Sequence, residues 1–189
     1  QTVLDEAEDG AKVALLDDMD VFFEDPAGES AFVITKDVDI DGNGKMVTTN
    51  GAGFWIKEDA KVRISDLTLE GSDATGQEDG AAWMGIGTYD QNKTVELEME
   101  NCTVEGFHYG FYFGAGDGTK ESSKTVCDFM SVAIRNCVAK GFYAENLTDS
   151  VFDGCNLIQN GAKETGDMTE ETKEGLSGME LNLKYGDYE

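Results

Sequence analysis

Residues 61–71 read KVRISDLTLEG, and this stretch decides the fold. Val62 and Ile64 alternate with polar residues, which is the pattern of a strand that faces a core on one side only. Ser65 and Asp66 interrupt the alternation, which then resumes and ends at a glycine. Because Asp tolerates a left-handed backbone and bonds to its own main chain, the interruption predicts a tight corner between two strands that face the same interior.

The same unit recurs along the chain at unequal distances. Its first inward residue after the corner falls at Met19, Val38, Leu67, Cys102, Cys137 and Cys155. The residue before each of these is, in order, Asp18, Asp37, Asp66, Asn101, Asn136 and Gly154. The residues that lie five before, three before and two after each of these inward positions are nearly all apolar. Unequal spacing of a stacked unit favours a coil of strands whose corner loops vary in length.

These observations predict an all-β chain, a right-handed parallel β-helix of about six coils with a short N-terminal capping helix. The predicted parts are residues 1–12 as the cap, 13–162 as the β-helix, and 163–189 as an acidic loop and a C-terminal strand. Apolar runs at 54–56, 83–86 and 111–113 would supply the third side of the coils. A β-sandwich is the competing fold, but it needs glycine-containing hairpin reversals, which the repeated two-residue corner does not resemble.

The chain carries 39 Asp and Glu against 14 Lys and Arg, a net charge of −25. A field of this sign repels phosphate backbones and anionic lipid, so no nucleic-acid partner and no membrane insertion is expected. No apolar run approaches the length of a membrane span. The chain opens with Gln rather than Met, so we expect that a signal peptide has been removed and that the protein is extracellular or at the cell surface.

Three stretches resemble bacterial cell-surface domains of the pectate-lyase-like superfamily. Residues 4–16 contain LDEAEDG followed by VALL, residues 40–45 read IDGNGK, and residues 61–71 match the next coil. The resemblance covers residues 3–162 and implies the β-helix fold. It implies little about activity, because the superfamily contains lyases, hydrolases, adhesins and passive stalks.

No catalytic or metal site is predicted. Asp37, Asp39 and Asp41 begin like a calcium loop, but Thr48 stands where that loop needs a bidentate Glu. Lyases of the resembled superfamily use carboxylate-bound calcium with an Arg or Lys base, and its hydrolases use Asp pairs near a His. The chain has neither motif. We therefore expect a protein that is not an enzyme and has no cofactor, since the residues do not support calcium.

An aromatic patch is the candidate carbohydrate-binding site. Its side chains are Trp83, His108, Tyr109, Tyr112 and Tyr143. Flat rings with wet polar edges lie well against pyranose faces, so an outward-facing patch would bind carbohydrate. The alternative is that these rings form the third wall of the core, because burial is the commoner use of aromatic rings.

Cys102, Cys137 and Cys155 are predicted to stack in one inward-facing column as small buried hydrophobes. Cys127 is predicted to lie in a loop before the next coil.

The sequons Asn-x-Thr give two glycosylation candidates, Asn92 and Asn146. The third sequon, at Asn101, falls on a predicted corner where the side chain should be occupied.

β-Helices end in open strand edges that must be capped or paired. The alternating residues Met179, Leu181, Leu183 and Tyr185 are predicted to form a strand that extends the edge of a second copy. Such contact is head to tail and does not close, so it generates a filament. We therefore expect a non-enzymatic structural protein, a cell-surface or filament-forming subunit acting in adhesion or assembly, with glycans as a further partner class. The alternative is a polysaccharide-active lyase or hydrolase, or a carbohydrate-binding module.

Overall fold

The computed structural model describes residues 1–72, 74, 80–88, 93–114, 124–161 and 177–181. These residues form one short helix, α1 (Thr2–Glu6), and sixteen strands. Every strand pairing between them is parallel. The chain is therefore all-β, as its alternating pattern predicts.

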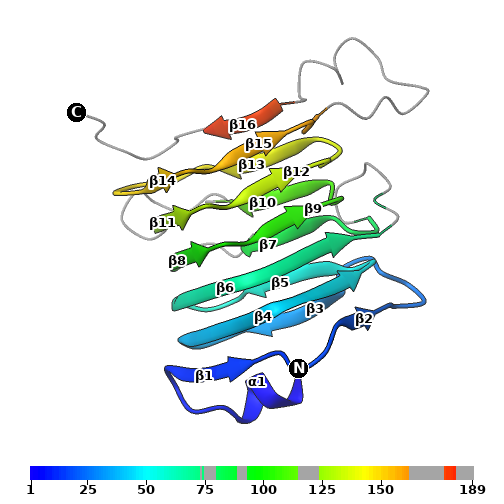
Figure 1. Cartoon of the computed structure of the whole chain (residues 1–189), viewed down its shortest axis with the longest axis vertical. Coiled ribbons are helices and arrows are strands. Elements are labelled where there is room, and N and C mark those ends of the chain that lie inside the picture. The colour runs from blue at the N-terminus through cyan, green and yellow to red at the C-terminus, as the bar shows by residue number, and fades with distance from the viewer. Residues whose placement is uncertain (73, 75–79, 89–92, 115–123, 162–176, 182–189) are drawn as a thin grey trace.

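The strands form two sheets, and strands that neighbour each other come from successive passages of the chain (Figure 1). Sheet A, which is strongly curled, contains β1 (Ala11–Ala14), β2 (Met19–Val21), β4 (Val38–Thr49), β6 (Ala60–Gly71), β8 (Thr94–Glu100), β9 (Thr103–Glu105), β11 (Lys124–Met130), β12 (Ala133–Arg135), β14 (Val151–Asp153) and β15 (Asn156–Ile158). Sheet B contains β3 (Ser30–Ile34), β5 (Ala52–Ile56), β7 (Met84–Thr88), β10 (Tyr109–Phe113), β13 (Lys140–Ala144) and β16 (Ser177–Leu181).

The core lies between the two sheets and is built from columns of like residues. Because paired strands are parallel and in register, each inward residue stacks on its counterpart in the next strand. One column of sheet A is Val13, Ile40, Ile64, Met99, Phe129 and Phe152. The facing column of sheet B is Phe32, Phe54, Ile86, Phe111, Phe142 and Met179. The predicted third-side runs are thus in sheet B, in and just before β5, β7 and β10.

The predicted corner is confirmed at three positions. Asp66, Asn101 and Gly154 all have a positive φ, of +50°, +53° and +61°. Ser131, at +57°, occupies the same place in the fifth unit. A left-handed residue at this point turns the chain while the residues on both sides keep their inward direction.

The predicted register is wrong in the first, second and fifth units. Met19 pairs with Val47, which pairs with Leu69, so the first unit is displaced by two residues from the predicted alignment of Met19 with Leu67. Val38 pairs with Val62 rather than aligning with Leu67, so the second unit is shifted along β4. In the fifth unit Ile134 pairs with Val104, a position that the sequence alignment gave to Ala139.

A second corner explains the error in the fifth unit. Asn136 has a φ of +58°, but it follows Arg135, which pairs with Glu105, so it stacks on Gly106 rather than on Asn101. The fifth unit therefore has two places where a turn residue precedes an inward apolar residue, at Ser131 and at Asn136. Aligning the units by sequence matches Asn136 with Asn101, whereas the pairing of the strands matches Ser131 with Asn101.

A ladder of glycines lets sheet B approach sheet A closely. The register places Gly53, Gly85, Gly110, Gly141 and Gly178 side by side on successive strands. A Cβ on Gly110 would lie 2.5 Å from the carbonyl oxygen of Gly141 and 2.9 Å from a methyl of Ile134. Only a residue without a side chain fits at this point.

The two ends of the molecule are closed to different extents. At the N-terminal end the Gln1 side-chain amide accepts from Val33 N (2.8 Å) and donates to Val33 O (3.1 Å), which satisfies part of the edge of β3. Lys36 Nζ donates to the Asp5 and Ala7 carbonyls and fixes α1 in place. At the C-terminal end β14, β15 and β16 each pair on one side only within the described residues. No described helix is long and apolar enough to span a bilayer.

Replacing Gly110 with Ala should destabilise the fold by about 1–3 kcal/mol, because the added methyl overlaps backbone atoms that have no room to move. Gly178→Ala is the matched control, since the nearest atom to its Cβ is a Leu157 side-chain carbon at 3.8 Å. The free energy of unfolding from urea titration measures both. Equal effects of the two changes would contradict the close approach of the sheets.

Candidate functional site

The five predicted aromatic-patch residues lie together on the outer face of sheet B. Tyr112 and Tyr143 are in register on β10 and β13, and their rings stack with centroids 5.1 Å apart. Trp83, just before β7, packs on Tyr112 at 4.8 Å, and Tyr109 lies 5.2 Å from Tyr112. His108 meets Tyr109 edge to face at 4.6 Å. We call these five side chains the aromatic cluster.

The aromatic cluster is separate from the main core but is largely covered. Phe107, Phe111, Phe113 and Phe142 are among the rings that fill the core, whereas Trp83 and Tyr109 belong to an outer apolar group. Trp83 and Tyr109 are nonetheless only 7% exposed, and Tyr112 and Tyr143 are half-buried. The cluster is thus neither the third wall of the core nor a fully open platform. Tyr112 and Tyr143 are more exposed than Trp83 and Tyr109.

Charged groups border the aromatic cluster. Lys140 Nζ lies 5.6 Å and 5.5 Å from the ring centroids of Tyr109 and Tyr143, and it pairs with Glu180 at 3.2 Å. The Tyr143 hydroxyl donates to Glu145 Oε1 at 2.7 Å. These contacts hold the rings through cation–π attraction and a charge-assisted hydrogen bond, and they join the last strand β16 to β13.

His108 is buried in a neutral form. Burial lowers the pKa of His108 from 6.5 to about 4, and the positive charge of Lys140 adds to this effect. Its Nδ1 atom is buried and has no hydrogen-bond partner in the described part of the chain. The imidazole therefore contributes to the cluster as an uncharged ring at neutral pH.

The three aspartates of the calcium-like run serve the backbone and a lysine instead. Asp37 accepts a hydrogen bond from Lys61 N at 2.7 Å, and Asp41 accepts one from Asn43 N at 2.7 Å. Asp39 pairs with Lys12 at 3.2 Å. Among the described residues no group of three or more His, Cys, Asp or Glu side chains is placed to hold a metal ion.

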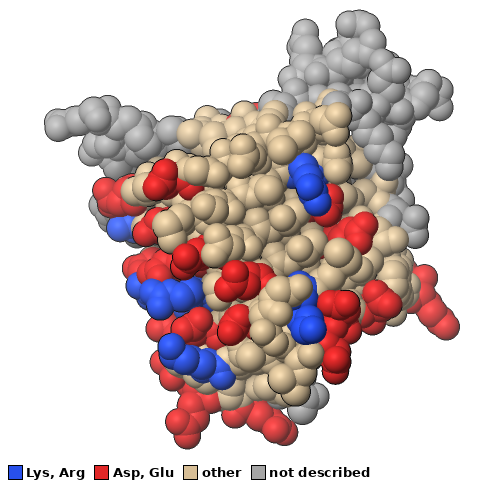
Figure 2. All heavy atoms as spheres, viewed as in Figure 1, with Lys and Arg blue, Asp and Glu red and all other residues tan. Residues whose placement is uncertain are grey.

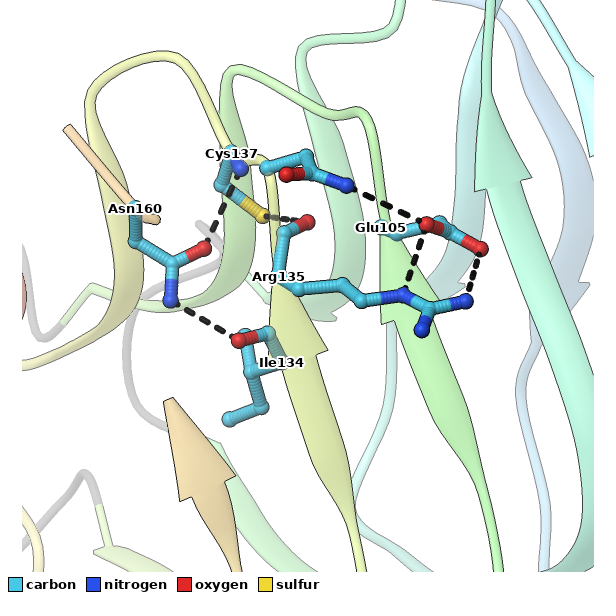
Figure 3. Close-up of polar contacts among 6 residues, drawn as sticks. Glu105, Ile134, Arg135, Cys137 and Asn160 are labelled. Carbon is cyan, nitrogen blue, oxygen red and sulfur yellow. Dashed lines mark hydrogen bonds and ion pairs between the residues drawn. The ribbon is translucent and has the colours of Figure 1, made fainter. Parts of the chain in front are cut away.

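Both arginines are held by carboxylates. Arg63 pairs with Glu98, which also binds Lys61, and hydrogen bonds from Lys61 and Arg63 lower the pKa of Glu98. Arg135 makes a two-bond contact with Glu105, at 2.8 Å and 2.9 Å (Figure 3). A guanidinium in such a fork stays charged, because the carboxylate raises its pKa further.

Asn160, which the sequence reasoning missed, joins two passages of the chain beside this pair. Its Oδ1 accepts from Cys137 N at 3.1 Å and its Nδ2 donates to Ile134 O at 2.9 Å (Figure 3). Asn50 makes the equivalent pair of bonds to Phe23 N and O, both at 2.9 Å. An Asn that follows a strand and precedes a Gly is the sequence signal that both residues share.

The predicted stack of Cys102, Cys137 and Cys155 is wrong at its middle member. The register places Val132 between Cys102 and Cys155, and Cys137 lies at the second corner. Cys127 is not in a loop but is buried in β11, where it pairs with Leu97. All four cysteines are free.

Three of the four thiols are correspondingly inert. Burial raises the pKa of Cys102 to about 11 and that of Cys137 to about 12, and it raises the pKa of Cys127 as well. Because the thiolate is the reactive form, these cysteines act as core side chains.

The asparagines of the three sequons differ in what the structure shows of their exposure. Asn146 is 7% exposed, which leaves no room for a glycan in the folded chain. Asn92 lies outside the described residues. Asn101, which the sequence interpretation set aside, is the exposed acceptor.

The predicted assembly strand is already used by its own molecule on one side. Met179 and Leu181 lie in β16, which pairs with β13, and they are 37% and 43% exposed. Leu183 and Tyr185 lie outside the described residues. Only the outer edge of β16 is left for another chain.

Comparison with known proteins gives no relative, since no family model, no curated protein and no solved structure matches the chain. The resemblance to the pectate-lyase-like superfamily therefore rests on the sequence motifs alone.

Lowering the pH should destabilise the native chain through His108. Its pKa is 6.5 when unfolded and about 4 when folded, so between these values only the unfolded state takes up the proton. Stability is therefore lost as the pH falls through this window, by on the order of 2–3 kcal/mol. His108→Gln removes the titrating group, and the difference between the two proteins in unfolding free energy against pH isolates it from the carboxylates. Identical pH profiles would contradict the burial of a neutral imidazole.

Proposed function

We propose that the chain is a right-handed parallel β-helix of about six coils that serves as a non-enzymatic structural subunit, at a cell surface or in an extracellular filament. Parallel pairing between successive passages of the chain and unbroken inward columns support this architecture. Two arginines held in ion pairs and aspartates occupied by backbone groups support a structural rather than a catalytic role.

The observation that carries the proposal is where large apolar side chains are exposed. In the described part of the chain these are Val3, Leu16 and Phe22 at the N-terminal end, Val151, Leu157, Ile158, Met179 and Leu181 at the C-terminal end, and Met46 and Met130 on the flank. Contiguous exposed apolar surface marks an interaction site. On the face shown in Figure 2, uncharged residues fill the centre and upper part, and carboxylates gather along the edges and at the lower, N-terminal end. The exposed apolar side chains at the two ends therefore favour association there.

The two ends suit a head-to-tail contact between copies. Among the described residues, the outer edges of β14, β15 and β16 have no paired strand at one end. At the other end an apolar hollow of about 330 Å³ lies between α1 and β1, bordered by Val13, Leu16 and Met19. Gln1, the N-cap residue of α1, already binds the edge of β3. A second copy would therefore make its contact with β1 and β2.

Variants with one blocked end test this contact. Leu16→Asp at the N-terminal end and Val151→Asp at the C-terminal end replace exposed side chains, so both should fold, and each should weaken self-association about tenfold or more. An equimolar mixture of the two should form a dimer in sedimentation velocity, because each variant keeps one intact end. Met46→Asp on the flank is the control and should behave like the native chain.

Two outcomes would contradict the proposal in different ways. A native chain that stays monomeric at all concentrations would show that it does not self-associate. A Leu16→Asp variant that still dimerises alone would show a tail-to-tail contact instead of head-to-tail.

Carbohydrate binding is the second candidate function, favoured by the gathering of all five predicted side chains in the aromatic cluster. The half-exposed rings of Tyr112 and Tyr143 would carry a flat sugar face, with Glu145 and Lys140 at their edges.

A glycan array followed by calorimetry should find a ligand whose affinity falls at least about tenfold in Tyr112→Ala. Phe22→Ala, which removes an exposed ring at the N-terminal end, is the control. An array without a hit, or equal loss in both variants, would contradict this function.

A further inference from the structure

Three Asn–Gly dipeptides occur in the chain, at residues 43–44, 50–51 and 160–161. In such a pair the backbone nitrogen of Gly can attack the side-chain carbonyl carbon of Asn, because no Cβ on the second residue stands in the way. The reaction needs the Asn side chain and the Gly nitrogen to be free to move together. The three sites differ in this freedom.

Two of the sites are locked by the fold. The Asn50 and Asn160 side chains each make two hydrogen bonds to the backbone of a neighbouring passage. The attacking nitrogens are also held, Gly51 N by Thr49 Oγ1 at 3.1 Å and Gly161 N by Cys137 O at 2.8 Å.

The third site is open. Asn43 and Gly44 are exposed, have positive φ angles of +52° and +70°, and lie where the pairing of β4 with β6 skips from Asp41 to Lys45. The Asn43 side chain makes one hydrogen bond, to Leu15 O at a long 3.3 Å. A Cβ built on Gly44 would meet nothing within 4 Å. Local opening therefore costs fewer hydrogen bonds here than at the other two sites.

We propose that Asn43 is a site of spontaneous, fold-selected deamidation. Gly44 N forms a bond to Asn43 Cγ, the Cγ–Nδ2 bond breaks, and the side-chain nitrogen leaves as ammonia with the proton from Gly44 N. Water then opens the succinimide ring to give aspartate or isoaspartate at position 43. No enzyme or oxidant is required.

The product changes the N-terminal end of the molecule. Loss of Nδ2 removes the hydrogen bond to Leu15, which borders the apolar hollow beside α1. A new negative charge appears close to Asp41, at an end that is already acidic. An isoaspartate also lengthens the backbone at a corner of β4.

Peptide mapping by mass spectrometry of the full chain, incubated in mildly alkaline buffer, measures conversion at all three sites in one sample. In the folded chain residue 43 should convert at least about tenfold faster than residues 50 and 160, because each locked site must first break two additional hydrogen bonds. In urea the three rates should agree within about threefold, since the unfolded chain has lost the bonds that distinguish them. Equal rates in the folded chain, or no conversion at Asn43 while the unfolded chain converts, would overturn the proposal.

Asp41→Ala gives an independent test. It removes the hydrogen bond from Asn43 N to Asp41 and replaces an exposed side chain. Conversion at Asn43 should rise several-fold while Asn50 and Asn160 keep their native rates. An unchanged rate at Asn43 would show that the corner does not control the reaction.

Discussion

Parallel, in-register pairing between successive passages of the chain is the constraint on which the rest of the structure depends. It places like residues above one another, so a single column such as Ile40, Ile64, Met99 and Phe129 must be apolar throughout. It also gathers the glycines of sheet B into one ladder, and that ladder lets the two sheets close on the core without a gap. Residues that stack in one column must therefore fit one another, and this limits the substitutions that each position tolerates.

The same register orders the surface charges. Lys12, Asp39, Arg63 and Glu98 follow one another on successive strands with alternating sign, and ion pairs form between the members. Beyond Glu98 the alternation fails, because Asp128 is the next residue in the column. Exposed ion pairs contribute little stability, but like charges in facing positions are unfavourable. The like charges of Glu98 and Asp128 at the end of this column therefore disfavour an acidic partner beside them.

Much of this architecture could be predicted from the sequence, since alternation and corner residues are local signals. The strands around Leu67 and Cys102, the corners at Asp66 and Asn101, and the grouping of the aromatic cluster all follow from such patterns. The placement of Cys137 did not, because Val132 and Cys137 each follow a turn residue with a positive φ. Only the backbone pairing distinguishes them. Val38 was misplaced because it follows the turn from β3 into β4 rather than a corner within sheet A.

The sequence predicts which residues form the aromatic cluster, but it does not predict how deeply each of them is buried. Spacing along the chain brings Tyr112 and Tyr143 onto one face of a sheet, whereas the covering of Trp83 and the neutral state of His108 depend on packing between strands. The roles of Asn50 and Asn160 were missed for a similar reason. Their hydrogen-bond partners, at Phe23 and at Ile134 and Cys137, belong to the preceding passage of the chain.

Disulfide formation between introduced cysteines tests the register most directly. Thr103 pairs with Ala133 on adjacent parallel strands, and both side chains are partly exposed, whereas the native thiols of Cys102, Cys127 and Cys137 are buried. Mild oxidation of a Thr103→Cys, Ala133→Cys double variant should give an intramolecular disulfide, because Cα atoms of paired strands lie within disulfide range. The pair Thr103→Cys, Val138→Cys, which the uncorrected sequence register would bring together, should stay reduced. A disulfide in the second pair and none in the first would contradict the register on which the columns, the glycine ladder and the open ends all depend.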